Sequence, residues 1–323
     1  MNERLVNYIE ESFLKPLLEI DTITDISYNG VSIFYMDNIL GRKKYQEEIS
    51  SEQATDFIRQ VANLAERQFS YTCPTLDISI SRYRINAQHS SIVRVGDNKS
   101  ISFAIRLASK KIQIQDNGSF METKARNILL GAIKEKKSIV IAGPTGSGKT
   151  ELQKYLISKF EEYTRVIIID NVQELDYVRF NADLDVTSWQ ISPTIPQGNA
   201  QELIRNALRN NPDWIVIAES RGQEMSDALT AVMTGHPIIT TLHAKTIEAI
   251  PRRMMRMIQA SNSKELPEDI ISDIYEHIDY YVYINRKINK DKKVVRFLES
   301  IATIDESNRF KVIYRKGEKN EKD

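Results

Sequence analysis

The chain has 323 residues, of which 41% are hydrophobic and 27% are charged, and its 44 basic and 44 acidic side chains give a formal net charge of zero. This length corresponds to about two domains, and the balanced charge argues against a protein whose whole surface binds nucleic acid. The single cysteine, Cys73, excludes an internal disulfide and a zinc site built on paired CxxC elements. We expect a reduced, cytosolic protein.

The first third of the chain has an α+β pattern. Apolar residues at helical spacing in MNERLVNYIEESFLKPLL predict an amphipathic helix, and the acidic residues among them exclude a signal peptide. Asn29-Gly30 between two strand-like segments predicts a tight hairpin. A helix is expected over 51–65, and further strands over 76–80, 83–87 and 101–107. We assign residues 1–109 to a smaller α+β N-terminal domain.

Residues 110–119 are polar and are assigned to a linker. From 120 to 323, helices alternate with short apolar strands, which is typical of an α/β domain whose parallel sheet is covered on both faces. The expected strands span 138–142, 165–170, 214–218 and 238–241. The segment 280–316 predicts antiparallel strands, and its surplus of basic residues is interpreted as a solvated face. No segment approaches the roughly 18–20 apolar residues that a membrane span needs.

The strongest motif is GPTGSGKT, which follows a predicted strand and begins a predicted helix. It fits the phosphate-binding pattern G-x-x-x-x-G-K-S/T in the required context. Its glycines allow backbone N–H groups to surround phosphate oxygens, the lysine reaches the β- and γ-phosphates, and the threonine hydroxyl ligates Mg²⁺. The sequence therefore predicts binding of ATP with Mg²⁺ at Gly143, Pro144, Thr145, Gly146, Ser147, Gly148, Lys149 and Thr150.

Acidic residues follow two of the predicted strands. In WIVIAES, Glu219 follows the apolar run and is the best candidate for the general base and for a metal ligand, where most P-loop enzymes have aspartate. Asp170 and Glu174 in RVIIIDNVQEL suit support of metal and water, although either is equally compatible with a turn residue. His243 follows a fourth strand, where a histidine can sense the γ-phosphate or reach an adjoining subunit, or be purely structural.

The segments GPTGSGKT, RVIIIDNVQEL, LRNNPDWIVIAESRGQEMSDAL and MTGHPIITTLHAKT stand in this order. Together they resemble the Walker A, Asp box, Walker B and His box of the traffic, or secretion, ATPases, which are hexameric motors of type IV secretion, conjugation and pilus assembly. The resemblance covers the C-terminal two thirds, and the third segment is most similar to VirB-type conjugation and Flp/Tad pilus ATPases. The type II branch carries a four-cysteine zinc insert, which a chain with Cys73 alone cannot hold.

The chain departs from the family pattern at three places. Asp170-Asn171 stands where the Asp box reads Glu-Asp, Ala218 replaces the glycine before the Walker B glutamate, and Leu107 follows Arg106 where the family has lysine. SRYRIN and ISFAIR nevertheless resemble the family's phosphate-facing arginine strands. The resemblance therefore implies that Arg84 and Arg106 bind nucleotide, and we add Arg221 as a third nucleotide-binding candidate. The alternative is that these are solvated surface arginines, which is the more common situation for an arginine chosen at random.

The resemblance implies a RecA-like P-loop core, a Mg²⁺-dependent ATPase and a homo-hexamer that powers secretion, conjugation or pilus biogenesis at the cytoplasmic face of the membrane. Its implied partners are inner-membrane components of such an apparatus, with peripheral membrane association. One alternative is a RecA-like nucleic-acid translocase, although basic stretches such as RRMMR are too short to indicate a DNA channel. Another is a scaffold that binds nucleotide without hydrolysing it.

Overall fold

The computed structural model describes residues 2–109, 111–171, 174–175, 183–192, 195–261, 264–290 and 293–318. The chain divides into two compact units. Unit 1 consists of Met1–Lys111, Val172–Tyr177 and Ile288–Val295, and unit 2 consists of Ile112–Asn171, Val178–Lys287 and Arg296–Asp323. Within the described segments, no helix is long and apolar enough to cross a bilayer.

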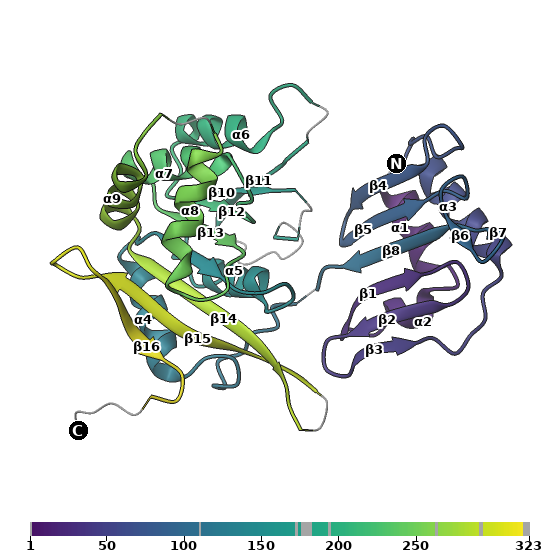
Figure 1. Cartoon of the computed structure of the whole chain (residues 1–323), viewed down its shortest axis with the longest axis horizontal. Coiled ribbons are helices and arrows are strands. Elements are labelled where there is room, and N and C mark those ends of the chain that lie inside the picture. The colour runs from purple at the N-terminus through teal and green to yellow at the C-terminus, as the bar shows by residue number, and fades with distance from the viewer. Residues whose placement is uncertain are drawn as a thin grey trace. The chain divides into compact units, whose positions relative to one another are not determined.

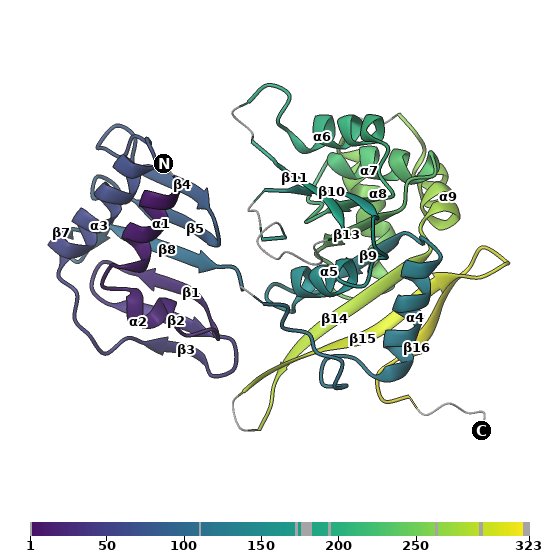
Figure 2. The same ribbon diagram turned by 180° about the vertical axis from the view of Figure 1, so that it is seen from behind.

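Unit 1 is a six-stranded sheet with helices on one face (Figures 1 and 2). The sheet order is β3-β2-β1-β8-β5-β4, and its neighbouring strands are antiparallel. The strands are β1 (Ile23–Tyr28), β2 (Ile33–Asp37), β3 (Gly41–Lys44), β4 (Thr75–Ile80), β5 (Tyr83–Gln88) and β8 (Ser102–Leu107). The helices are α1 (Asn2–Glu10), α2 (Lys15–Leu18) and α3 (Ser51–Leu64), and a small hairpin joins β6 (Arg94–Val95) to β7 (Asn98–Lys99).

Local sequence signals explain most of unit 1. The predicted hairpin forms at Asn29-Gly30, where Gly30 has a φ of 96° and the Asn29 side chain accepts hydrogen bonds from the N–H groups of Val31 and Ser32. The predicted single N-terminal helix is wrong, because α1 and α2 are separate. Pro16 has no N–H for a continued helix, and the Ser12 hydroxyl instead donates to the Ile9 carbonyl at 2.7 Å and ends the first helix.

Unit 2 is an eight-stranded sheet in the order β11-β10-β12-β13-β9-β14-β15-β16. The strands are β9 (Ile139–Ala142), β10 (Arg165–Asp170), β11 (Asp185–Gln190), β12 (Trp214–Ile217), β13 (Ile238–Leu242), β14 (Tyr280–Ile288), β15 (Val294–Ile304) and β16 (Phe310–Arg315). The pairs from β11 to β14 are parallel, whereas β15 and β16 are antiparallel. The central parallel strands are wholly buried, as their unbroken apolar sequences predict.

Helices cover both faces of this sheet (Figures 1 and 2). On one face lie α6 (Ala200–Ala207), η1 (Leu208–Asn210), α7 (Glu224–Met233), α8 (Ala249–Gln259) and α9 (Pro267–His277), whose apolar side chains form one core with the strands. On the other lie α4 (Thr123–Lys134) and α5 (Lys149–Ile157). The expected α/β core and smaller α+β unit are confirmed. The prediction that all strands over 280–316 are antiparallel is wrong for β14, which pairs in parallel with β9 after a helical crossover.

Most of the predicted linker, residues 112–119, is part of unit 2. The Asp116 carboxylate accepts hydrogen bonds from the Tyr155 hydroxyl at 2.5 Å and from the Lys159 ammonium at 3.1 Å. The pKa of Asp116 lies below its usual value, mainly because of the hydrogen bond from Tyr155. The nearby positive charges of Lys159 and Arg126 lower it further. The domain boundaries at 109 and 120 stay a prediction.

Candidate active site

The predicted phosphate loop joins β9 to α5. Gly146 and Gly148 have φ angles of 71° and 99°, which favour glycine, and a Cβ at Gly143 would clash with the Ile284 carbonyl oxygen. Gly148 precedes α5 and gives it no side-chain cap. The Ser147 hydroxyl is buried and has no hydrogen-bond partner among the described residues. This loop is therefore shaped for backbone contact with an anion, and it fits a phosphate group.

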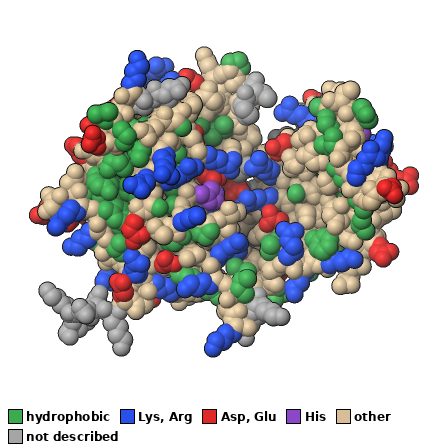
Figure 3. Space-filling view, in the orientation of Figure 1, with side chains coloured by type: hydrophobic (Ala, Val, Ile, Leu, Met, Phe, Trp, Pro, Cys, Tyr) green, Lys and Arg blue, Asp and Glu red, His purple; other side chains and the backbone are tan. Residues whose placement is uncertain are grey.

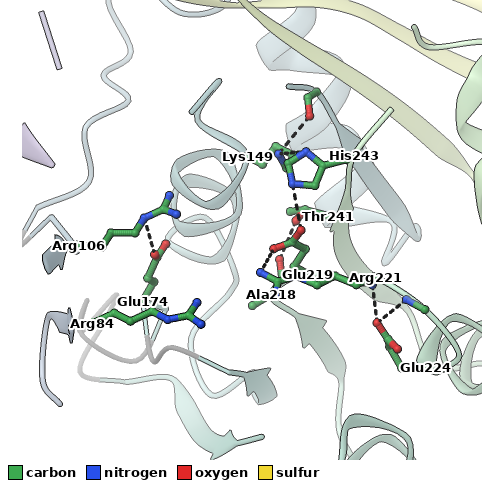
Figure 4. Close-up of polar contacts among 12 residues, drawn as sticks. Arg84, Arg106, Lys149, Glu174, Ala218, Glu219, Arg221, Glu224, Thr241 and His243 are labelled. Carbon is green, nitrogen blue, oxygen red and sulfur yellow. Dashed lines mark hydrogen bonds and ion pairs between the residues drawn. The ribbon is translucent and has the colours of Figure 1, made fainter. Parts of the chain in front are cut away.

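Lys149 is buried at the base of the loop. Its ammonium lies 3.1 Å from the Gly143 carbonyl, 3.3 Å from the Pro144 carbonyl and 3.3 Å from Nδ1 of His243 (Figure 4). An ammonium can only donate hydrogen bonds. Nδ1 of His243 must therefore be the acceptor, which leaves the ring proton of the neutral imidazole on Nε2.

His243 connects Lys149 to Glu219. Its Nε2 lies 3.1 Å from Oε1 of Glu219, and Oε2 of the same carboxylate lies 2.8 Å from the Arg221 guanidinium (Figure 4). Parallel pairing of β12 with β13 brings these strand ends together, and the Thr241 hydroxyl adds a 2.8 Å bond to the Ala218 carbonyl. On the part of the surface in Figure 3 that belongs to unit 2, Lys and Arg side chains gather around a histidine.

The charges around Glu219 keep it ionised. Burial alone would raise the pKa of Glu219, but the hydrogen bond from Arg221 and the positive charges of Arg221 and Lys149 hold it below its usual value. The Glu219 hydrogen bond in turn raises the pKa of Arg221, and Glu224 and Asp170 add to this effect. Asp170, buried at the end of β10, thus contributes negative charge to the same cluster.

Unit 2 brings together most of the residues that the sequence singled out. Lys149, His243, Glu219 and Arg221 form one connected set, and Asp170 lies near enough to influence Arg221. Glu174 and the predicted arginines Arg84 and Arg106 belong to unit 1. Asp170, the neighbour of Glu174 in the predicted Asp box, belongs to unit 2.

In unit 1, Arg84 and Arg106 stand directly opposite each other on β5 and β8. Their neighbours Ile85 and Ile105 are buried in the core, so the arginines occupy the opposite face of the sheet, which the helices leave uncovered. Arg106 lies 3.5 Å from Glu174 (Figure 4). Arg84 lies 3.5 Å from Asp77 on β4. Like charges directly opposite on paired strands are unfavourable by themselves.

The structure also adds two residues to the loop that sequence reasoning missed. Arg296 on β15 donates from Nε to the Gly146 carbonyl at 2.7 Å, and Arg286 on β14 lies against the same glycine. The sequence offered no signal for them beyond a basic C-terminal segment, which was interpreted as solvated. That interpretation is wrong for Arg296, because this side chain contacts the phosphate loop.

The family model described as Type II/IV secretion system protein matches residues 86–279. An uncharacterized protein of Bacillus anthracis is 30% identical over 296 residues, which cover 86% of this chain. The chain spans about 64% of that relative's length. The type IV secretion system protein VirB11 of Brucella suis is 29% identical over 187 residues, covering 55% of this chain and 49% of VirB11.

Among solved structures, the Legionella pneumophila ATPase DotB matches with a TM-score of 0.68 at 24% identity, covering 92% of this chain and 82% of DotB. This similarity supports the P-loop α/β fold. The resemblance drawn from the four sequence segments is confirmed at the level of the family, because the family model matches more than half of the chain. The chain belongs to the type II/IV secretion system protein family.

Proposed function

We propose that the chain binds ATP at the phosphate loop and hydrolyses it. The observation that carries this proposal is the unbroken set of contacts from Lys149 through His243 to Glu219. It supports a site in which a phosphate-binding lysine and a carboxylate base act on one nucleotide. As the water oxygen attacks the γ-phosphorus, Glu219 takes the water's proton and the bond to the β-phosphate oxygen breaks, which leaves ADP and phosphate.

The residues present fit Mg²⁺ with ATP. The glycine-lined loop and the unpartnered Ser147 hydroxyl suit phosphate oxygens, and Thr150 and Glu219 offer oxygen ligands of the kind that Mg²⁺ prefers. Bound Mg²⁺ would supply positive charge that offsets charge developing on the phosphates. Asp170 would support this site through Arg221, and His243 would hold Glu219 in place.

The proposed activity is tested by phosphate release from ATP by the purified chain, with MgCl₂ and with EDTA. Turnover that requires Mg²⁺ supports the proposal, and binding of ATP without turnover would favour the non-hydrolysing scaffold. Addition of single-stranded DNA distinguishes the nucleic-acid translocase, which is expected to show DNA-stimulated turnover and a DNA affinity that falls steeply with salt. Helix α8 exposes Arg252, Arg253 and Arg256, which could make such contacts.

We further propose that the protein is a hexameric motor at the cytoplasmic face of the membrane, where it works with inner-membrane components of a secretion, conjugation or pilus apparatus. VirB11 is named as a type IV secretion system protein, which supports this assignment. A head-to-tail interface must close into a ring or polymerise. Sedimentation velocity with ADP or a non-hydrolysable ATP analogue is expected to show a single species of six chains, and a monomer at every nucleotide concentration would contradict the ring.

The pH dependence of turnover should reveal the interaction between Arg221 and Glu219. In the wild type, the lowered pKa keeps Glu219 ionised above its ordinary value of 4.5, and activity is lost only as the pH falls through that lowered pKa. In Arg221→Gln, the guanidinium would no longer offset the effect of burial, which raises the pKa of Glu219. The pKa of Glu219 should rise, and the acidic limb of kcat/KM for ATP should move to higher pH.

The matched control for this prediction is Arg309→Gln in the β15–β16 turn, an exposed arginine that pairs with Asp305, four residues before it, at 3.2 Å. Its acidic limb should coincide with that of the wild type. If the Arg221→Gln limb also coincides with the wild type, Arg221 does not control the ionisation of Glu219.

We also propose that Arg84 and Arg106 bind nucleotide phosphate, as their family resemblance implies. Two guanidiniums face each other on a sheet face that the helices leave uncovered, and together they favour binding of an anion. Arginine suits phosphate because its guanidinium can donate two parallel hydrogen bonds to phosphate oxygens. Their present carboxylate partners, at 3.5 Å, are partly exposed and therefore weak.

The double variant Arg84→Ala/Arg106→Ala is expected to weaken ATP binding by about tenfold or more, since each charge-assisted bond typically contributes about 1.5–3 kcal/mol. It should also abolish any ATP-induced change in the distance between the two units, measured by fluorescence transfer with a non-hydrolysable analogue. The control is Arg59→Ala, which removes an exposed arginine of α3 in the same unit. Unchanged affinity and an unchanged distance response in the double variant would leave both arginines without a nucleotide role.

A further inference from the structure

The strands β14 and β15 bring two arginines to one glycine of the phosphate loop. Arg296 donates from Nε to the Gly146 carbonyl at 2.7 Å. A terminal nitrogen of Arg286 lies 2.9 Å from the position that a Cβ would take on Gly146, so this guanidinium fills the space beside the glycine. The stem of Arg296 continues along the loop, with its Cδ 3.8 Å from the corresponding position on Gly148.

Arg296 stabilises a segment that glycine makes intrinsically flexible. Gly146 is exposed and has a positive φ. The Ser147 N–H bonds to the Pro144 carbonyl at 3.2 Å, and Lys149 bonds to the Gly143 and Pro144 carbonyls, but neither contact holds the Gly146 carbonyl. By binding the Gly146 carbonyl, Arg296 fixes the orientation of the peptide between Gly146 and Ser147. A loop that is ordered in advance loses less conformational entropy when it binds a ligand.

Arg286 adds positive charge beside the loop. Burial, and next the positive charge of Arg286, lower the pKa of Arg296. Among the residues that the structure describes, no carboxylate lies within ion-pair distance of Arg286. The guanidinium of Arg286 in this position favours an anion beside the loop, and the loop is itself shaped for phosphate.

We propose that Arg286 is a further phosphate ligand of the nucleotide site and that Arg296 is a positioning residue that holds Gly146 in its binding conformation. This inference rests on the proposed ATP site. It assigns to the β14–β15 hairpin a direct contact with the polyphosphate of ADP and ATP, in addition to Lys149 and the loop N–H groups. Because the contact is to phosphate, it should discriminate nucleoside diphosphates and triphosphates from the uncharged nucleoside.

The test compares the dissociation constants of ATP, ADP and adenosine by calorimetry for the full chain and for Arg286→Gln. Loss of a charge-assisted contact should weaken ATP and ADP by about tenfold or more and leave adenosine binding unchanged. The control is Arg309→Gln, whose constants should all equal those of the wild type. Equal weakening of all three ligands, or no weakening of any, would overturn the phosphate role of Arg286.

Arg296 is tested by a pair of variants that separate packing from hydrogen bonding. Arg296→Met keeps an unbranched side chain but no donor, whereas Arg296→Lys keeps both a donor and the charge. Arg296→Met should raise KM for ATP by about tenfold or more with a smaller change in kcat, since the lost contact stabilises the bound ATP and the transition state equally. Arg296→Lys should retain most of the wild-type affinity. Identical behaviour of the two variants would contradict the positioning role.

These outcomes are distinguishable from failure of the proposed function. If the wild-type chain binds neither ATP nor ADP, the nucleotide site itself is wrong, and the arginine inference is overturned with it. If the wild type binds both and the arginine variants bind equally well, the nucleotide site stands and only the inference about Arg286 and Arg296 is overturned. Thermal unfolding midpoints equal to that of Arg309→Gln will show that each variant is folded.

Discussion

Replacing Glu219 by glutamine is expected to lower the rate of ATP hydrolysis by about 10²- to 10⁴-fold, the usual contribution of a general base. The amide has nearly the same shape, and its single oxygen can still accept from Arg221, which lies 2.8 Å from one carboxylate oxygen, but its NH₂ group cannot accept from His243, which lies 3.1 Å from the other. It cannot take the proton of the attacking water. Turnover is measured by phosphate release, and affinity by titration with a fluorescent ATP analogue.

The affinity of Glu219→Gln for ATP should stay close to that of the wild type, because Lys149 and the loop remain unchanged. The matched control is Glu248→Gln, which alters an exposed glutamate whose partner is Arg315, at 3.3 Å. This control should retain full turnover. A turnover number for Glu219→Gln equal to that of the control would transfer the base role to another acid, first of all to buried Asp170.

Replacing Lys149 by alanine is expected to weaken ATP binding by about 100-fold or more, since it removes a charged donor that would contact both the β- and γ-phosphates. In the structure, its ammonium already lies among the loop carbonyls and 3.3 Å from His243. The variant also removes the donor to Nδ1 of His243. Calorimetric titration with ATP and ADP measures the loss.

Lys136→Ala is the control for Lys149→Ala, because Lys136 is a surface lysine that pairs with Asp213 at 2.6 Å, away from the loop. Both variants should unfold cooperatively and give circular dichroism spectra like that of the wild type. Wild-type affinity in a folded Lys149→Ala chain would show that the nucleotide binds somewhere other than the phosphate loop.

The sequence predicts the phosphate loop and the residues around it, because motif spacing and the order of strands and helices determine where these residues lie. The spacing in GPTGSGKT and its position between strand and helix determine the loop, and parallel pairing places the residues after β12 and β13 at one sheet edge. Glu219 and His243 follow those strands directly. Their contact is thus a consequence of strand order, which alternation of helix and apolar strand predicts well.

The residues that escaped prediction depend on long-range pairing. Arg286 and Arg296 reach the loop only because β14 lies parallel to β9 with β15 beside it, and a basic sequence contains no information about that partner strand. Strand β11 was missed because DVTSWQ mixes polar and apolar residues. Glu174 was grouped with Asp170 by sequence proximity, whereas the structure pairs it with Arg106 in unit 1.

The most direct test of a single site that both binds and hydrolyses ATP is a single-turnover measurement. Excess protein is mixed with Mg²⁺ and γ-labelled ATP, quenched with acid at increasing times, and the released phosphate is counted. We expect the wild type to convert all bound ATP to ADP, and Glu219→Gln to bind the same amount and retain it as ATP. Conversion at the same rate in both chains, or no bound ATP in the wild type, would contradict this account of the site.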